Sequence, residues 1–145
     1  MIIRAESVHI AKIAEIEKEA FSDPWSERSV EGAISEEINI VMADVCGESV
    51  RGYIIGSCDG FSGYIERIAV ASEFRKNGIG TALLTEFQKA LPETAESISL
   101  EVRASNLPAI GLYGSFGFER AGVRRGMYSS PKEDGIVMIK KIHNG

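Results

Sequence analysis

The sequence predicts an α+β fold in which a mixed, mostly antiparallel sheet carries helices on both faces. Two observations indicate this class. Three segments rich in Val, Ile and Tyr follow one another with turn residues between them, which is typical of an antiparallel meander. Helical and strand periodicities then alternate, which is typical of a βαβ unit added to the sheet. The expected order is β-α-α-β-β-β-α-β-α-β-β, in a single domain over residues 1–145.

The first third of the chain predicts one short strand and two helices. Residues 2–3 suggest the strand, and Ser7 is a suitable N-cap for the first helix. Apolar residues recur at helical spacing after that cap, at Ile10, Ile13, Ile16 and Ala20. The helix should end before Asp23-Pro24. Ser26 is a suitable cap for a second, short helix, whose length Gly32 makes uncertain.

The middle of the chain predicts the meander and then a long helix. The three strands are expected at residues 38–45, 50–57 and 64–70, separated by turns at 47–48 and 59–60. From Gly78 the apolar period becomes that of a helix, which Pro92 ends. The stripe of that helix consists of Ile79, Leu83, Leu84, Phe87 and Leu91.

The last third predicts a strand, a helix and a hairpin. In residues 97–102 apolar and polar residues alternate, so that Glu101 projects from the face opposite the core. Asn106 is a suitable N-cap for the helix, and Gly117 ends it. The hairpin arms are expected at 118–127 and 136–142, with a turn-rich tip at 129–135.

Composition and charge exclude several classes of protein. Cys46 and Cys58 stand twelve residues apart without a Cys-x-x-Cys motif, so we expect no metal site and two reduced, partly buried thiols. A net charge of −5 with dispersed Lys and Arg argues against nucleic acid and leaves open a basic partner. No window reaches the roughly 18 apolar residues of a membrane span, and no leader pattern is evident, so we expect a cytoplasmic protein without membrane contact.

The most informative segment joins the strand ending at Val70 to the helix that follows. Gly78 and Gly80 stand two apart at a helix start, where backbone N–H groups can converge on an anion, and Arg75 and Lys76 add positive charge. For an isolated Gly-x-Gly, a plain turn is the commoner interpretation. A Rossmann motif would need a third glycine, and a Walker loop would need a Lys after the second one.

The second informative segment covers residues 100–118. Asn106, Ile110 and Tyr113 step by four and three, so one helix face presents a carboxamide near its start and a phenol further along. Together with Glu101, that face can line a cleft. For each residue alone, a solvated carboxylate and a core tyrosine with its hydroxyl at the rim are the commoner interpretations.

Both segments resemble a known family. Arg75-x-x-Gly78-x-Gly80 resembles the acetyl-CoA loop of the GNAT superfamily of N-acyltransferases, Gln/Arg-x-x-Gly-x-Gly/Ala. Residues 100–118 resemble the block Leu-Glu-Val-Arg-x-Ser-Asn-x-x-Ala-x-x-Leu-Tyr-x-x-x-Gly-Phe of bacterial ribosomal-protein-alanine N-acetyltransferases. The resemblance extends to residues 24–26, which read Pro-Trp-Ser, and to Arg124-Arg125 ahead of Tyr128. Met127 departs from the pattern, since such enzymes often place an aromatic residue there.

The resemblance implies an acetyl-CoA-dependent N-alpha-acetyltransferase that transfers acetyl directly in a ternary complex. It implies Glu101 as general base, Tyr113 as general acid, and Trp25 and Tyr128 as acceptor contacts. The acceptor it implies is the N-terminal amine, with alanine first, of a basic ribosomal protein. The positions it implies for acetyl-CoA binding are Ile68, Ala69, Val70, Arg75, Lys76, Asn77, Gly78, Ile79, Gly80, Thr81 and Asn106.

The acceptor and some residue roles stay open at this point. An α-amino group with a pKa of about 7.7–8.0 loses its proton more easily than a lysine near 10.4, which favours a chain terminus without proving it. A lysine side chain, a small-molecule amine, or a non-catalytic acyl-CoA-binding module are the alternatives. Trp25 can cover the core as easily as it can line a cleft. Cys58 has no neighbouring His and is interpreted as packing in the sheet.

Overall fold

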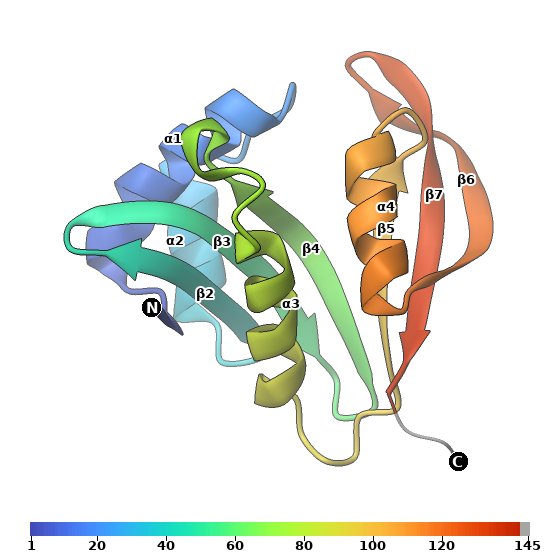
Figure 1. Cartoon of the computed structure of the whole chain (residues 1–145), viewed down its shortest axis with the longest axis horizontal. Helices are drawn as coiled ribbons and strands as arrows, with labels where there is room; N and C mark the ends of the chain where they lie inside the picture. Colours follow the sequence, from blue (N-terminus) through green and yellow to red (C-terminus); the bar gives the residue numbers. More distant parts are fainter. Residues whose placement is uncertain (143–145) are drawn as a thin grey trace.

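The computed structural model describes residues 1–142, in which seven strands form one sheet in the order β1-β2-β3-β4-β5-β7-β6. Neighbouring strands are antiparallel except for the central pair β4 and β5, which is parallel (Figure 1). The strands are β1 (Ile2–Arg4), β2 (Asn39–Cys46), β3 (Ser49–Cys58), β4 (Ser62–Val70), β5 (Ser97–Arg103), β6 (Glu119–Ser129) and β7 (Lys132–Lys141). The helices are α1 (Ile10–Ala20), α2 (Glu27–Ser35), α3 (Ile79–Ala90) and α4 (Leu107–Phe116), with short 3-10 turns η1 (Ser7–His9) and η2 (Ser72–Phe74).

The predicted fold class and element order are confirmed, and several predicted helix ends have the expected cause. The Ser26 hydroxyl accepts from the Ser29 N–H at 3.1 Å and caps α2. The Asn106 carboxamide oxygen accepts from the Ala109 N–H at 3.2 Å and caps α4. That helix ends at Gly117, whose φ of 108° lies in the left-handed region that favours glycine.

Three local predictions were wrong. Ser7 does not cap α1: it begins η1, where the side chains of Glu6 and His9 cap each other's backbone instead. The hairpin tip is shorter than 129–135, because Tyr128 pairs with Glu133 and Ser129 with Lys132, which leaves only residues 130–131 between the strands. Residues 132–134 are all charged, which is typical of a loop. They nevertheless form the start of β7, because the end of a hairpin need not bury apolar side chains. Cys46 is exposed rather than partly buried, since it ends β2 beside a turn, whereas Cys58 is half-buried as expected.

The core consists of two clusters on opposite faces of the sheet, and β3 contributes to both by alternation. Ile54 belongs to the cluster that packs under α3 and α4, whereas Tyr53 and Ile55 belong to the cluster under α1 and α2. The predicted stripe of α3 is buried at Ile79, Leu83, Leu84 and Phe87. No helix within residues 1–142 is long and apolar enough to cross a membrane.

The feature that positions the site is the separation of the two parallel strands. Pairing between β4 and β5 extends only from Ser62 opposite Ser97 to Ile65 opposite Leu100. Beyond that point the strands diverge, and the sheet opens into a V between the second half of β4 and the end of β5 (Figure 1). The segments with predicted chemistry, 68–81 and 101–113, follow the two arms of this V.

Candidate active site

The second half of β4 presents backbone hydrogen-bonding groups to the V. Within residues 1–142, no strand pairs with β4 on its β5 side after Ile65. The Ala71 N–H donates to the Arg51 carbonyl at 2.8 Å, and Val70 lies opposite Gly52. Antiparallel pairing alternates, so the N–H and C=O of Val70 and Ile68 point away from β3 and into the V. An extended chain can therefore hydrogen-bond to this edge as an added strand would.

The loop between β4 and α3 has the backbone geometry of an anion site. Lys76 and Gly78 have φ of 66° and 76°, and Gly78 is the N-cap of α3. The N–H groups of the first helical turn have no partner inside the helix and lie at the positive end of its dipole. The Arg75 side chain is exposed and donates through Nε to the Val70 carbonyl at 3.1 Å, so it joins this loop to the open edge of β4.

Gly80 has a packing role that its position in the motif did not reveal. A Cβ at Gly80 would lie 2.9 Å from a terminal methyl group of Leu112 on α4. The absence of a side chain therefore lets α3 and α4 approach each other at the loop. A Cβ at Gly78 would meet no atom within 4 Å, so Gly78 is needed for its left-handed backbone instead.

The carboxylate of Glu101 is held by two side chains at the point where the strands separate. Its Oε1 accepts from the hydroxyl of Tyr64 at 3.2 Å, and its Oε2 lies 2.9 Å from the guanidinium of Arg124. The Glu101 side chain is only 12% exposed. Burial, and then the Glu101 charge, raise the pKa of Tyr64 to about 12, so its hydroxyl remains a donor at neutral pH. The Glu101 carboxylate is therefore held in a fixed orientation by these two partners.

Tyr113 is buried between α4 and the sheet rather than exposed at a rim. It is 7% exposed, and its ring meets that of Phe118 edge-on at 5.9 Å between centroids. Burial, and to a lesser extent nearby Tyr128, raise the pKa of the Tyr113 hydroxyl well above its usual range. The phenol is therefore protonated across the pH range in which proteins are assayed.

Tyr128 lies near the end of β6 and contacts the last residue of β5. Burial, and then the charge of Glu101, raise its pKa, and its ring is stacked under the guanidinium of Arg103 at 4.4 Å. The Arg103 side chain that contacts Tyr128 leaves the same face of β5 as Glu101, two residues before it, so Tyr128 lies on the Glu101 side of the sheet. Asn106 has a structural role, because its side-chain oxygen caps α4.

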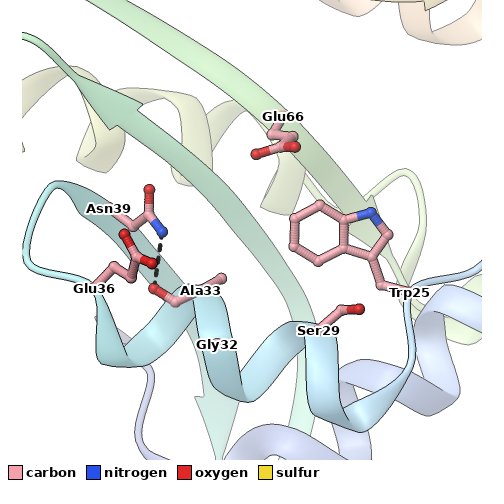
Figure 2. A pocket seen from close by; sticks show the side chains of 7 residues that line it. All are labelled: Trp25, Ser29, Gly32, Ala33, Glu36, Asn39 and Glu66. Carbon is pink, nitrogen blue, oxygen red and sulfur yellow. Dashed lines mark hydrogen bonds between the residues drawn. The ribbon is translucent and has the colours of Figure 1, made fainter.

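Trp25 packs against the core and also lines a depression at the surface. Its ring packs beside the cluster under α1 and α2, and its N–H backbone group donates to Glu17 at 2.8 Å. The same ring walls a shallow depression of about 380 Å³ (Figure 2). The other residues lining this depression are Ser29, Gly32, Ala33, Glu36, Asn39 and Glu66.

Four polar residues in this region were given no role by the sequence analysis: Glu17, Tyr64, Arg67 and Arg103. Arg103 had a signal, because it is the arginine of the Leu-Glu-Val-Arg block. Tyr64 lies opposite Ser99 in the parallel pair and therefore shares a face with Glu101, but this register is set only in the folded sheet. The partners of the other three come from distant parts of the chain. Among residues 1–142, no three His, Cys, Asp or Glu side chains form a group suited to a metal ion.

The diverging parallel strands and the glycine-bearing loop at the start of α3 define the class of protein. The chain belongs to the acetyltransferase (GNAT) family, whose sequence profile matches residues 10–118, and it is an N-acetyltransferase.

The chain is similar to several N-acetyltransferases over most of its length. The chain is 38% identical to an uncharacterized N-acetyltransferase of Methanocaldococcus jannaschii, over 99% of this chain and 94% of that protein. It is 34% identical to the ribosomal protein bS18-alanine N-acetyltransferase of Salmonella typhimurium, over 88% of each. The crystal structure of the Escherichia coli ribosomal-protein-S18-alanine N-acetyltransferase superposes with a TM-score of 0.87 at 29% identity, over 100% of this chain and 95% of that one.

Proposed function

We propose that the protein transfers acetyl from acetyl-CoA to the N-terminal amine of a ribosomal protein that begins with alanine. The observation that carries this proposal is the Glu101 carboxylate, oriented by Tyr64 and Arg124 beside the open edge of β4. The similarity to enzymes named for ribosomal protein bS18-alanine supports the choice of acceptor. The net charge of −5 favours a cationic partner.

The residues that would bind acetyl-CoA fit its chemistry in two parts. The outward-facing backbone groups of Ile68 and Val70, on either side of Ala69, can pair with the amide groups of an extended pantetheine arm. The α3 N-terminus over residues 77–81, with Arg75 and Lys76, can bind the pyrophosphate through N–H groups and positive charge. In this arrangement Asn106 contributes by fixing the start of α4, which packs against α3 at Gly80.

In the proposed reaction the acceptor must first become a neutral amine. Glu101 takes a proton from the ammonium group, directly or through a water molecule. The amine nitrogen then attacks the thioester carbonyl, whose oxygen the Val70 N–H is oriented to stabilise. The C–N bond forms, and the C–S bond breaks with its electron pair on sulfur.

Tyr113 supplies a proton to the departing sulfur. A phenol with a raised pKa is a weaker acid than a thiol, so a tyrosinate does not accumulate and the transfer has to accompany cleavage of the C–S bond. As the C–N bond forms, the nitrogen loses its second proton, which restores the Tyr113 phenol directly or through water, and Glu101 releases the first proton to solvent. The products are the N-acetylated chain and CoA with a free thiol, without a covalent enzyme intermediate.

The acceptor choice follows from the same acid–base argument. At pH 7 an α-amino group is about 10% neutral, whereas a lysine is neutral at below about 0.1%, so one carboxylate base serves the terminus more easily. Trp25 and Tyr128 would contact the acceptor from the two sides of the V, one from the segment before α2 and the other from β6.

The proposal is tested with acetyl-CoA and a matched set of peptides. An Ala-initiated peptide that also contains lysine should release CoA thiol, and mass spectrometry should locate the acetyl group on the terminal nitrogen. The same peptide with a formylated N-terminus serves as the control and should not react. Reaction of the formylated peptide would assign lysine as acceptor. Turnover only with polyamines or aminoglycosides would assign a small amine, and no CoA release with any acceptor would support a non-catalytic binding module.

A further inference from the structure

The connection between α1 and α2 spans the open end of the V. We name residues 21–26 the strap. On the β4 side the strap is attached by Arg67, which donates to the Asp23 carbonyl at 3.4 Å and stacks over the ring of Phe21 at 3.9 Å. The Trp25 ring lies 5.7 Å from the same guanidinium. The strap is therefore bound to the arm of the V that also carries the open backbone edge.

On the β5 side the strap is attached by Arg103, the last residue of its strand. One guanidinium nitrogen lies 3.3 Å from the Ser22 hydroxyl and 3.2 Å from the Ser130 carbonyl. The other lies 2.8 Å from the Pro131 carbonyl and 3.3 Å from Glu133. Ser22 also donates to the Ser130 carbonyl, so the strap touches the tip of the β6–β7 hairpin directly. In Figure 1 the connection after α1 and the hairpin tip lie side by side at the top of the V.

Arg103 thus joins three segments that the chain keeps far apart: the end of β5, the strap and the hairpin tip. Its side chain is 19% exposed, and its guanidinium also stacks on Tyr128. Glu133 strengthens the junction, because it accepts from the Ser105 N–H at 2.6 Å while it pairs with Arg103. Hydrogen bonds from Ser105, then from Arg103, hold the pKa of Glu133 below its usual range. The carboxylate is therefore charged at neutral pH.

We propose that Arg103 is a positioning residue for the acceptor, which ties the strap to the hairpin tip and holds Tyr128 in place before the acceptor binds. This inference rests on the proposed function, because it concerns the site where the acceptor would enter. When the two segments are already ordered, a peptide that enters between them does not have to order them. Its binding is therefore tighter. Arg103 acts through Ser22, Ser130 and Tyr128 and need not touch the reacting atoms.

Arginine suits this position better than lysine. Its planar fork reaches two carbonyls, a hydroxyl and a carboxylate at once and stacks on an aromatic ring with its face. A lysine ammonium is a compact group that cannot keep this set of partners. Arg103→Lys should therefore retain only part of the effect, although it preserves the charge.

The kinetic test compares Arg103→Met and Arg103→Lys with Arg120→Met, an exposed arginine on β6 that serves as the matched control. Arg103→Met should raise KM for the Ala-initiated peptide about tenfold, with kcat and KM for acetyl-CoA within about twofold. Arg103→Lys should be intermediate, and Arg120→Met should match the wild type. Ser22→Ala should raise the peptide KM less, and combining it with Arg103→Met should add less than the product of the two effects. An unchanged peptide KM in Arg103→Met, or an equal rise in KM for acetyl-CoA, would overturn the proposal.

A second measurement does not depend on turnover. Trp25 is the only tryptophan of the chain and lies in the strap, so acrylamide quenching of its fluorescence reports how well the strap is ordered. Quenching should be faster in Arg103→Met than in the wild type and unchanged in Arg120→Met. If the wild type acetylates no peptide, the proposed function fails while this comparison still decides whether Arg103 orders the strap. Equal quenching in all three proteins would show that it does not.

Discussion

The guanidinium of Arg67 lies 2.6 Å from the carboxylate of Glu17, which is fully buried beneath the strap. The contact is bidentate, because Nε of Arg67 also donates to the second carboxylate oxygen at 3.2 Å. The hydroxyl of Tyr53 and the backbone N–H of Trp25 complete the hydrogen bonds to this carboxylate. One buried charge on α1 therefore holds both the β4 arm of the V and the strap.

Loss of this pair should destabilise the fold. Arg67→Met leaves the Glu17 carboxylate buried without its cation, and we expect the free energy of unfolding to fall by about 3–5 kcal/mol. Urea denaturation at pH 7 measures this, with Lys12→Met on the exposed side of α1 as control. Glu17→Gln in the Arg67→Met background should recover part of the loss, because it removes the unpaired charge. A loss below about 1 kcal/mol would contradict the assigned role of the pair.

Removal of the Tyr113 hydroxyl should affect chemistry and not folding. Tyr113→Phe keeps the ring that packs against Phe118, so the unfolding midpoint should change little. We expect kcat to fall by about 100-fold or more, with KM for acetyl-CoA nearly unchanged, because a general acid acts in the transition state. Steady-state kinetics with an Ala-initiated peptide measure both constants. A kcat equal to that of the wild type would remove Tyr113 as the acid.

Glu101→Gln should give a loss of activity that depends on pH. Without the base, the reaction relies on acceptor that is already neutral, so kcat/KM should fall most near pH 7 and recover partly as pH rises through about 8. Glu119→Gln, at an exposed carboxylate on β6, is the matched control. It makes the same chemical change away from the V, so its activity and pH profile should match those of the wild type. Parallel pH profiles for wild type and Glu101→Gln would argue against a base.

At high pH the tyrosines should lose their phenol protons only as the protein unfolds. All four tyrosines of the chain, Tyr53, Tyr64, Tyr113 and Tyr128, have raised pKa values, in each case chiefly through burial. A raised pKa in the folded state gives stability that is complete below the unfolded value of about 10 and is lost as pH rises through the folded values. Tyrosinate absorbance should therefore appear above pH 10 together with loss of the circular dichroism signal. Ionisation of one tyrosine near pH 10 in a protein that stays folded would contradict this.

Gly56 should tolerate no side chain. A Cβ there would lie 2.5 Å from both the Phe87 ring and the carbonyl oxygen of Tyr64, so β4 would have to move. We expect Gly56→Ala to lower the free energy of unfolding by about 1–3 kcal/mol. Gly32→Ala is the control, because a Cβ in that position of α2 meets no atom within 4 Å. It should raise stability by up to about 1 kcal/mol through helix propensity. Equal midpoints for the two variants in thermal unfolding would refute the packing argument.

Local patterns in the sequence predicted the elements because their causes are local. The stripe of α3, the Ser26 and Asn106 caps and the stop at Gly117 depend on residues within a turn or two of each other. Where two local solutions competed, the prediction was wrong. Glu6 and His9 displaced Ser7 as the cap, and strand pairing extended through residues 132–134 although their composition is that of a turn.

The sequence by itself determined the fold class and the glycine-bearing loop, and it singled out Glu101 and Tyr113 as the residues proposed here for the chemistry. Only the tertiary structure decided what surrounds those residues. Tyr64 and Arg124 bind the Glu101 carboxylate, and Tyr113 is buried. Arg103 binds the strap through Ser22. Ser22 and Ser130 meet although they stand 108 positions apart. Such contacts follow from the strand order and from where β4 and β5 separate, and periodicity, which senses only near neighbours, contains no information about them.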